Sequence, residues 1–484
     1  MNNNRSITNN VLWKFAERFF AQIVSFAVSL VLARILLPKD YGVVAIILVF
    51  IELANAFVTY GLGNSLIQKK DSDDVDFSSV LYFNLGLSLV LYLILFFFSP
   101  LIANFYNQQL LVPITRVFGI RLFFAAINSV QQAYVAKQMI FKRFFWATFI
   151  GTIVSGAVGI LMALRGFGAW ALVAQYITNT TIDTIVLSFF IKWRPKAVFS
   201  WKRIGKLFKF GWKILYEGVF STLSSQIRSL IIGKVYTESD LGHYSKANQF
   251  PDLIMNNINL SISAVLFPAM SNIQDQEEKM IFLMRKSVKI TSYILFPMLF
   301  GMAAVASNMV TVLLTDKWSG CIPFVYIACF CHLMTIGMYP RHQALKAKGK
   351  SGVFMIEHAV SRVINFLILL AVFRISVLSI AISSAIGSVI LMIIIMYTSK
   401  RFTGYKYKDQ VKDVGEIYLM SILMFVLTFK LGIIMDFNPI VELIIQVVVG
   451  ATIYLLLSVF LKPEGFAFCI SFVKKIFKKE GANG

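Results

Sequence analysis

The 484-residue sequence has few of the residues from which soluble enzymes and disulfide-linked domains are built. Charged residues make up 14% of the chain, and Cys and His occur four times each. No CxxC pair is present, so the sequence indicates neither a zinc ribbon nor a disulfide framework. Cys329, Cys331 and His332 lie in an apolar stretch, where free Cys usually serves as a small hydrophobic side chain. A nucleotide-binding GxxxxGKS/T loop is also missing. We therefore expect no metal site, no cofactor and no direct use of ATP.

Long apolar stretches take the place of these residues. Hydrophobic residues make up 58% of the chain and the mean hydropathy is +0.73, whereas a soluble domain has about 45–50% apolar residues. Stretches of about twenty apolar residues cross a bilayer as helices. The pattern predicts an all-α integral membrane protein with about 14 transmembrane helices. The predicted spans are 11–33, 42–62, 79–103, 112–136, 144–164, 168–191, 207–233, 243–270, 281–306, 320–345, 353–373, 376–399, 414–435 and 438–461.

The net charge of +22 is distributed unevenly between the loops. The termini and the loops on one side of the membrane carry 31 of the 46 Lys and Arg residues, and the loops on the other side carry nine. Lys and Arg accumulate in cytoplasmic loops, so we expect both termini in the cytoplasm. The charge is a topology signal, because no soluble basic domain remains that would bind nucleic acid.

One turn occurs twice in the chain, as LARILLPKDYGVV over residues 32–44 and as IIGKVYTESDLGHY over residues 231–244. Each copy runs from an apolar stretch to an Asp (Asp40, Asp240) and a Gly (Gly42, Gly242), where the next apolar stretch begins. Six predicted spans separate the copies, so both face the same way across the membrane. This spacing indicates a parallel repeat whose axis lies along the membrane normal.

Further matches support the repeat. An offset of 211 residues aligns QQAYVAK with HQALKAK and pairs Arg121 with His332, while an offset of 200 pairs Glu52 with Asp252. Polar residues in the first and seventh spans share spacings of 4, 4, 3 and 4, which keeps each set on one helix face. These sets are Lys14, Arg18, Gln22, Ser25 and Ser29, and Lys213, Glu217, Ser221, Ser224 and Arg228.

The repeat predicts two pseudo-symmetric six-helix lobes. We place the N-lobe at 1–195, a basic cytoplasmic linker at 196–206, the C-lobe at 207–400, an accessory helix hairpin at 401–461 and a basic cytoplasmic tail at 462–484. A charged side chain at the bilayer centre costs at least about 2.5–3.5 kcal/mol and normally faces a protein interior or a water-filled path. Two like-oriented lobes with charged faces therefore predict a central cavity that opens alternately to each side of the membrane.

Several separated motifs resemble one known family. LARILLPKDYGVVA, GLGNSLIQKKD, FYNQQLLVPITRVFGIR, GFGAWALVAQ, LGHYSKANQFPDLI and SAVLFPAMSNIQ resemble the polysaccharide flippases of the MOP exporter superfamily, especially the Wzx-type lipopolysaccharide and colanic-acid exporters. The resemblance covers about residues 8–400. It implies a two-lobed MOP/MATE-like fold in the bacterial inner membrane. It also implies a flippase that moves an undecaprenyl-diphosphate-linked oligosaccharide from the cytoplasmic to the periplasmic leaflet, with a polysaccharide polymerase as a candidate partner.

Such a substrate needs cations for its diphosphate and hydrogen-bonding side chains for its sugars. Arginine binds phosphate through a planar bidentate fork. A proton or sodium gradient would act through a membrane carboxylate. The headgroup candidates are Arg18, Lys213, Arg228, Arg121, Arg362 and Lys14; for each, an ion pair such as Lys213 with Glu217 is the alternative. The sugar-facing candidates are Gln22, Asn55, Asn128, Gln131, Gln132, Asn256 and Asn259. The coupling candidates are Glu17, Glu52, Glu217 and Asp252.

Other interpretations stay open. A lipid II-type flippase or a multidrug exporter of the same superfamily would share the fold, although the cation-bearing faces favour an anionic substrate. The segment KKDSDDVD contains Asp71-Ser72-Asp73, a DxD pattern by which glycosyltransferases hold a metal. No nucleotide-binding fold surrounds it, so we expect a solvated charge run and a protein that is not a membrane glycan-processing enzyme. A scaffold would give no reason for repeated charged faces.

Overall fold

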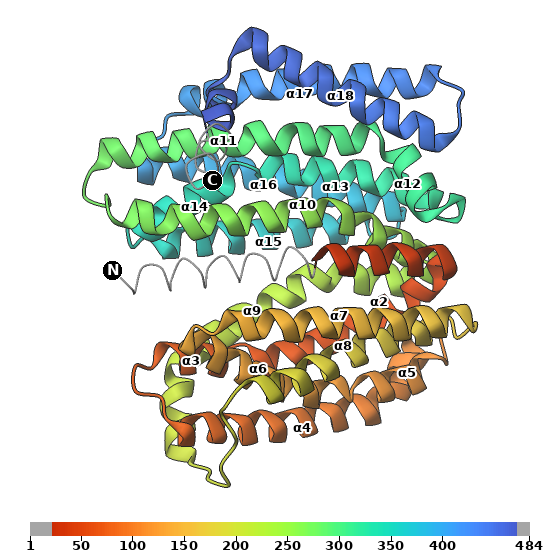
Figure 1. The fold of residues 1–484 in the computed structure, drawn as a ribbon, viewed down its shortest axis with the longest axis vertical. Helices are drawn as coiled ribbons and strands as arrows, with labels where there is room; N and C mark the ends of the chain where they lie inside the picture. The colour runs from red at the N-terminus through yellow and green to blue at the C-terminus, as the bar shows by residue number, and fades with distance from the viewer. Residues whose placement is uncertain (1–21, 472–484) are drawn as a thin grey trace, which may run out of the picture. The chain divides into compact units, whose positions relative to one another are not determined.

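A computed structural model describes residues 22–471, and the regular structure in this range is helical throughout (Figure 1). Packing divides the chain into two compact units, Met1–Ser245 and Lys246–Gly484, and the division falls inside α10 (Glu238–Ser271). The first unit contains the helix Gln22–Ile35, α2 (Pro38–Thr59), α3 (Leu62–Gln68), α4 (Asp74–Tyr106), α5 (Leu111–Phe118), α6 (Arg121–Gln138), α7 (Phe141–Leu164), α8 (Ala169–Phe190) and α9 (Trp201–Val235). The second contains α11 (Glu277–Ala304), α12 (Ala306–Leu314), η1 (Asp316–Cys321), α13 (Ile322–Thr335), α14 (Met338–Ala347), α15 (Ser351–Val372), α16 (Val377–Thr403), α17 (Tyr407–Ile434) and α18 (Pro439–Leu461).

Ten segments of the described chain are long and apolar enough to cross a membrane, and each overlaps a predicted span. The predicted spans 168–191, 207–233 and 243–270 coincide with α8, α9 and α10, which are helical but more polar. The all-helical, multi-pass membrane fold is therefore confirmed, whereas the count of fourteen stays a prediction. The ten segments are Pro38–Gln68, Asp74–Tyr106, Leu111–Gln138, Arg143–Leu164, Glu277–Ala304, Asp316–Ala347, Gly352–Val372, Val377–Thr403, Tyr407–Ile434 and Pro439–Leu461.

The first unit includes α9, although the predicted C-lobe begins at residue 207. α9 packs along α2, while α6 contacts α2, α4 and α8, and α7 lies along α8. An apolar core joins α3, the start of α4 and the start of α9 through Leu66, Phe77 and Leu207. Trp193, from the segment between α8 and α9, is buried in this core with its ring centroid 5.8 Å from that of Phe77. The start of α9 is thus fixed to the first unit by apolar packing.

The second unit ends in α17 and α18, which lie side by side at its outer edge in Figure 1. α17 also packs along α11, where a charged contact fixes their register. The Arg285 guanidinium donates to both carboxylate oxygens of Asp413, over 2.7 and 2.9 Å. The same carboxylate accepts a hydrogen bond from the Tyr405 hydroxyl at 2.8 Å. The helices that the sequence predicts as an accessory hairpin are therefore docked on α11.

The two copies of the repeated turn have the same hydrogen-bonded form. At the start of α2, the Asp40 carboxylate accepts from the backbone N–H of Leu37 at 3.0 Å. At the start of α10, the Asp240 carboxylate accepts from the backbone N–H of Thr237 at 3.2 Å. An acidic residue that bonds back to the N-cap in this way satisfies a donor near the helix start. The Asp of each copy is therefore part of a helix-start signal.

The glycines of the two copies place α2 and α10 in backbone contact. A Cβ atom on Gly42 would lie 1.7 Å from the carbonyl oxygen of Glu238, the first residue of α10. A Cβ atom on Gly242 would lie 2.0 Å from the carbonyl oxygen of Pro38, the first residue of α2. Only a residue without a side chain fits at either position. The two copies of the turn therefore pack reciprocally on each other.

Gly242→Ala is expected to lower the melting temperature of the purified protein in detergent, because the new methyl group would overlap the Pro38 carbonyl group. Overpacking of this kind costs about 1–3 kcal/mol. The control is Gly86→Ala in α4, where nothing lies within 4 Å of the Cβ position. The control should melt at the wild-type temperature or slightly above it, since Ala favours a helix. Equal melting temperatures for the two variants would contradict the backbone contact.

Candidate functional site

A polar cleft of about 380 Å³ lies in the first unit between the α2–α3 segment, α6 and α8. Its volume is within the range of small-molecule sites, about 300–1,000 Å³. Four predicted site residues line it together, namely Asn55 of α2 and Arg121, Asn128 and Gln132 of α6. Asp183 of α8 lines it as well. The structure thus brings together one predicted headgroup residue and three predicted sugar-facing residues.

The polar face of α6 forms one wall of the cleft. Arg121, Ala125, Asn128, Gln132 and Ala136 line it at spacings of 4, 3, 4 and 4 residues. This spacing keeps side chains on one face of a helix. The two Ala side chains leave space, and the three polar side chains supply a cation and two amides. The wall therefore combines room for a ligand with groups that would bind one.

Arg121 is held in a defined orientation by residues of three helices. Its Nη1 donates to Glu52 Oε1 of α2 at 3.0 Å, and its Nε donates to Thr180 Oγ1 of α8 at 2.9 Å. The rings of Phe118 and Tyr176 lie 5.9 and 5.7 Å from the guanidinium carbon. A guanidinium group has five N–H donors, and these two hydrogen bonds engage two of them.

Two amides of the cleft have buried polar atoms that find no hydrogen-bond partner among the described residues. These atoms are Asn55 Oδ1 and Asn128 Nδ2, an acceptor and a donor. The other polar atom of the second amide, Asn128 Oδ1, accepts from Gln132. Buried polar atoms in folded proteins are nearly always paired. A ligand hydroxyl group or a water molecule would satisfy both open positions.

Gln131 does not line the cleft, although its neighbour Gln132 does. Its side chain is buried against α8, where the amide donates to the Ser188 hydroxyl at 2.6 Å and to the Thr184 carbonyl at 3.4 Å. Consecutive residues of an α-helix point about 100° apart, so the two glutamines face different neighbours. The prediction that Gln131 faces the sugar stays a prediction, and this cleft does not support it.

The predicted residues of α9 also lie away from the cleft. Lys213 and Glu217 are exposed, and within the described part of the chain no ion pair joins them. Arg228 is half-buried, as is Gln22 on the helix Gln22–Ile35. Their roles in binding or coupling stay predictions. Three further candidates lie outside the residues that the structure describes: Lys14, Glu17 and Arg18.

The second unit places two predicted residues at one face of α10. Asp252 contacts His332 of α13, with Oδ1 and Nε2 3.0 Å apart. Asn256 follows one turn later and is exposed, so it shares this face. Asn259 is buried, and Arg362 on α15 is half-buried. The contact of Asp252 with His332 is thus the best-defined feature among the predicted residues of this unit.

A buried polar cluster of the second unit is a functional candidate that the sequence patterns do not single out. His342 Nε2 of α14 lies 2.9 Å from Glu357 Oε2 of α15, and the other Glu357 oxygen accepts from the Thr398 hydroxyl of α16. His342 and Glu357 are both buried. The signal available in the sequence is the acidic Glu357 inside a predicted span, since such residues are costly in lipid.

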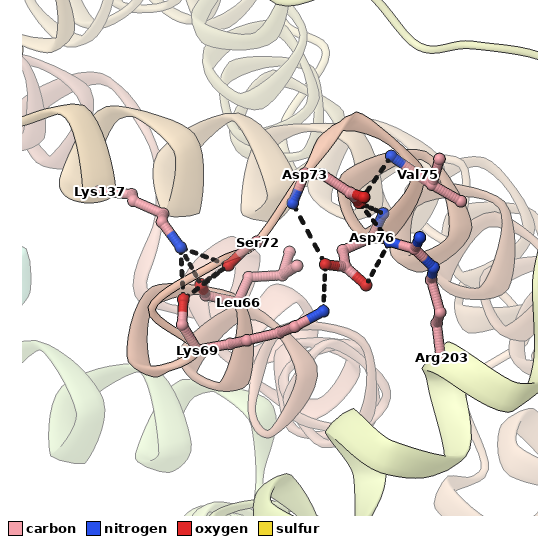
Figure 2. A network of polar contacts seen from close by, with 8 residues as sticks. All are labelled: Leu66, Lys69, Ser72, Asp73, Val75, Asp76, Lys137 and Arg203. Atoms are coloured by element: carbon pink, nitrogen blue, oxygen red, sulfur yellow. Dashed lines mark hydrogen bonds and ion pairs between the residues drawn. The ribbon is translucent and has the colours of Figure 1, made fainter.

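A network of charges joins the loop before α4 to the start of α9, and Figure 2 shows Lys69 and Arg203 approaching Asp76 from different elements. Asp73 is the N-cap of α4 and accepts from the backbone N–H groups of Val75 and Asp76 at 3.1 and 2.9 Å. Arg203 also pairs with Asp73. Asp76 is 0% exposed. The expectation of a solvated charge run is therefore wrong for Asp76.

Asp73 and Asp76 already have partners within the protein, namely Lys and Arg side chains and backbone N–H groups at the start of α4. Arg203 holds the pKa of Asp73 well below its usual range, chiefly through their side-chain hydrogen bond. On the other side of the loop, Lys137 donates to the carbonyl groups of Leu66 and Lys69 and to the Ser72 hydroxyl (Figure 2). The DxD pattern is thus part of a structural connection between α3, α4, α6 and α9.

Arg203→Gln is expected to lower the melting temperature by an amount that depends on pH. Because the folded pKa of Asp73 is depressed, its stabilising contact is fully present above the ordinary Asp pKa of about 3.9 and is lost as pH falls through the folded value. The melting-temperature gap between wild type and variant should therefore be constant above about pH 5 and narrow below about pH 4. Lys70→Gln, at an exposed neighbouring position, should open no such gap. A gap that persists unchanged in acid would count against the Asp73 contact.

A cleft with a cation and amide groups among apolar helices suits a polar ligand in a multi-pass membrane protein. Residues 31–323 match the family described as polysaccharide biosynthesis protein, and the chain belongs to this family. It is 26% identical over 420 residues to the lipopolysaccharide biosynthesis protein WzxC of Escherichia coli (strain K12). This alignment covers 84% of this chain and 83% of that protein. It is 25% identical over 317 residues to the succinoglycan biosynthesis transport protein ExoT of Rhizobium meliloti (strain 1021). This alignment covers 66% of this chain and 64% of that protein.

A solved structure shows the same fold. The lipid II flippase MurJ, in an inward closed conformation, superposes with a TM-score of 0.77 at 16% identity, covering 93% of this chain and 99% of that chain. At this identity the likeness establishes the fold, which is that of the MOP-type transporters. The sequence resemblance to polysaccharide flippases is confirmed by the family match and by the named relatives.

Proposed function

We propose that the protein is a flippase that moves an undecaprenyl-diphosphate-linked oligosaccharide from the cytoplasmic to the periplasmic leaflet of the bacterial inner membrane by alternating access. The observation that carries the proposal is the cleft of the first unit, in which Arg121 lies beside the amides of Asn55 and Asn128. The relatives support it, because one is named for lipopolysaccharide biosynthesis and the other as a transport protein of succinoglycan biosynthesis.

The chemistry of the cleft matches the two parts of such a substrate. A guanidinium group forms charge-assisted, bidentate hydrogen bonds with phosphate oxygens, and Arg121 keeps N–H donors beyond those that Glu52 and Thr180 engage. The open positions on Asn55 and Asn128 suit sugar hydroxyl groups, which both donate and accept. A volume of about 380 Å³ suits one portion of the headgroup at a time. Arg121 would therefore orient the diphosphate while the amides contact the adjacent sugar.

We infer a topology of fourteen spans in two six-helix lobes, with α17 and α18 as an accessory hairpin and both termini in the cytoplasm. Helices α8, α9 and α10 lie where the sequence predicts three of the spans. The reciprocal turns at Gly42 and Gly242 support the repeat. The loop distribution of Lys and Arg supports the orientation. The protein would act as a transporter and leave the chemistry of glycan assembly to enzymes such as a polysaccharide polymerase.

An ion gradient is the proposed energy source, acting through a carboxylate in the membrane. Glu52 is ion-paired with Arg121, which lines the cleft; Asp252 contacts His332, and Glu217 is exposed on α9. Moving one charge through 100 mV is worth about 2.3 kcal/mol, which is enough to change the populations of two states substantially. Proton and sodium ion remain the two candidate coupling ions.

The proposal is tested by translocation in proteoliposomes, with undecaprenyl-diphosphate oligosaccharide in one arm and lipid II in the other. Each arm is measured with and without a pH gradient or a membrane potential. We expect movement of the oligosaccharide lipid and faster movement when a gradient is applied. If only lipid II moved, lipid II would be the substrate and the oligosaccharide lipid would not. If neither lipid moved under any gradient, the proposed function would be refuted.

Arg121→Lys is expected to slow translocation about tenfold or more, because Lys keeps the charge but lacks the planar fork. A tenfold slower rate corresponds to about 1.4 kcal/mol of activation free energy. The matched control is Arg165→Lys, at an exposed arginine after α7 that does not line the cleft. Melting temperatures of both variants show whether they fold. A wild-type rate in a folded Arg121→Lys variant would contradict the proposal that Arg121 binds the substrate.

A further inference from the structure

The first turns of α9 have a buried face and a charged face on opposite sides of the helix. Ile204, Leu207 and Gly211 are buried in the first unit, at spacings of 3 and 4 residues. Lysines recur at spacings of 4, 3 and 4 residues, which keeps them on one helix face. A step of about 100° per residue places this lysine stripe opposite the buried face. The lysine stripe consists of Lys202, Lys206, Lys209 and Lys213, and all four are exposed.

Exposed aromatic side chains lie between these two faces. Trp201, Phe208 and Trp212 recur at spacings of 7 and 4 residues and are 70%, 44% and 47% exposed. The Trp201 ring packs edge to face against Phe199, with ring centroids 4.9 Å apart, and against Phe83 of α4 at 6.1 Å. Trp side chains are enriched at the headgroup level of membranes, because one end is apolar and the other is polar. Aromatic rings beside lysines are therefore suited to the boundary between lipid and water.

The length and course of α9 place its first turns at the membrane surface. Its 35 residues extend over about 52 Å at 1.5 Å per residue, whereas the hydrocarbon core of a bilayer is about 30 Å thick. In the proposed topology, on which this placement rests, α9 crosses the membrane and begins in the cytoplasm. In Figure 1 the yellow-green start of α9 runs across the direction of α4 and not along it. The first turns of α9 are thus positioned along the cytoplasmic surface of the membrane.

The lysine stripe carries charge that the neighbouring chain does not balance. No Asp or Glu occurs from residue 184 to residue 216, whereas this stretch contains eight Lys and Arg residues. Two of the eight are paired with acidic residues at the start of α4, namely Lys196 with Asp74 and Arg203 with Asp73. Within the part of the chain that the structure describes, no ion pair involves the lysine stripe. Its positive charge is therefore complementary to an anion from outside the protein.

We propose that the lysine stripe and the aromatic side chains beside it form a binding surface for anionic phospholipids of the cytoplasmic leaflet. The phosphate groups would contact the ammonium groups of the stripe, while Trp201, Phe208 and Trp212 lie among the headgroups and the upper acyl chains. A basic segment next to a membrane helix gains about fivefold in affinity for an anionic membrane with each Lys near the surface. A soluble acidic partner would match the charge but would leave the aromatic side chains without lipid.

The surface is tested by titrating the purified full-length protein, in a neutral detergent, with phosphatidylglycerol or phosphatidylcholine. Native mass spectrometry counts the bound lipids. We expect the triple variant Lys202→Gln/Lys206→Gln/Lys209→Gln to bind phosphatidylglycerol at least about tenfold more weakly than the wild type. Its binding of phosphatidylcholine should not change, because that headgroup has no net charge. Equal losses for the two lipids would overturn the proposal.

The control variant is Lys279→Gln/Lys286→Gln/Lys408→Gln, which removes the same charge from exposed positions of the second unit. It should bind phosphatidylglycerol as the wild type does, and an equal loss in both triple variants would contradict a surface on α9. Melting temperatures show whether both variants fold. The difference between them should shrink from about 0.1 M to about 1 M salt, where the Debye length falls from about 10 Å to about 3 Å. No substrate is present, so the result does not depend on the flippase function.

A second measurement locates Trp201 without changing any lysine. In vesicles of lipid with brominated acyl chains, the Trp201 signal is the difference in fluorescence between wild type and Trp201→Phe. We expect brominated phosphatidylglycerol to quench this signal more strongly than brominated phosphatidylcholine does. The control is Trp193→Phe, at a buried position before α9, whose difference signal should respond equally to both lipids. Equal quenching of the Trp201 signal by both lipids would overturn the preference for anionic lipid. No quenching by either lipid would place the surface in water, favour a soluble acidic partner and overturn the proposal.

Discussion

The backbone contact between the starts of α2 and α10 is the constraint on which the geometry of the first unit depends. Two helix N-termini carry partial positive charge and repel each other when they meet. Each copy of the turn offsets this with an acidic residue in its first turn, Asp40 or Asp240, and with a Gly that lets the peptide groups touch. The contact fixes the entry of α2, and α2 carries Asn55 to the cleft and Glu52 to Arg121. A change at the turn is therefore expected to alter the geometry of the cleft.

In each unit a buried carboxylate is paired with a cation of another helix. Asp413 joins α17 to α11, and Asp76 joins α4 to α9. Removing one partner of a buried pair costs about 3–5 kcal/mol, although replacing the whole pair by apolar residues is often neutral. The pairs are therefore better understood as devices that fix helix register than as a net source of stability. In the cleft the same device holds Arg121 while leaving some of its donors for a ligand.

The sequence contains most of the fold but only part of the site. The repeat could be predicted because the two turns have the same local structure, and the Asp and Gly residues that each turn needs stand at matching positions in the sequence. Arg121 and Glu52 could be identified as costly charges in apolar spans. The different surroundings of Gln132, which lines the cleft, and Gln131, which contacts α8, could not be predicted. They depend on which face of α6 meets α8. The burial of Asp76 depends on Arg203, which is distant in the sequence and whose approach only the packing of α9 determines.

The free energies of a two-state cycle set a limit on what a single proton can accomplish. Each pH unit changes the free energy of one titrating group by at most about 1.36 kcal/mol. Converting a two-state equilibrium from 1:99 to 99:1 needs about 5.5 kcal/mol. A gradient of one or two pH units acting through one membrane carboxylate would therefore bias the conformational cycle without driving it alone. The remaining free energy has to come from interactions that differ between the two states, and a substrate that binds the two states with different affinities would supply it.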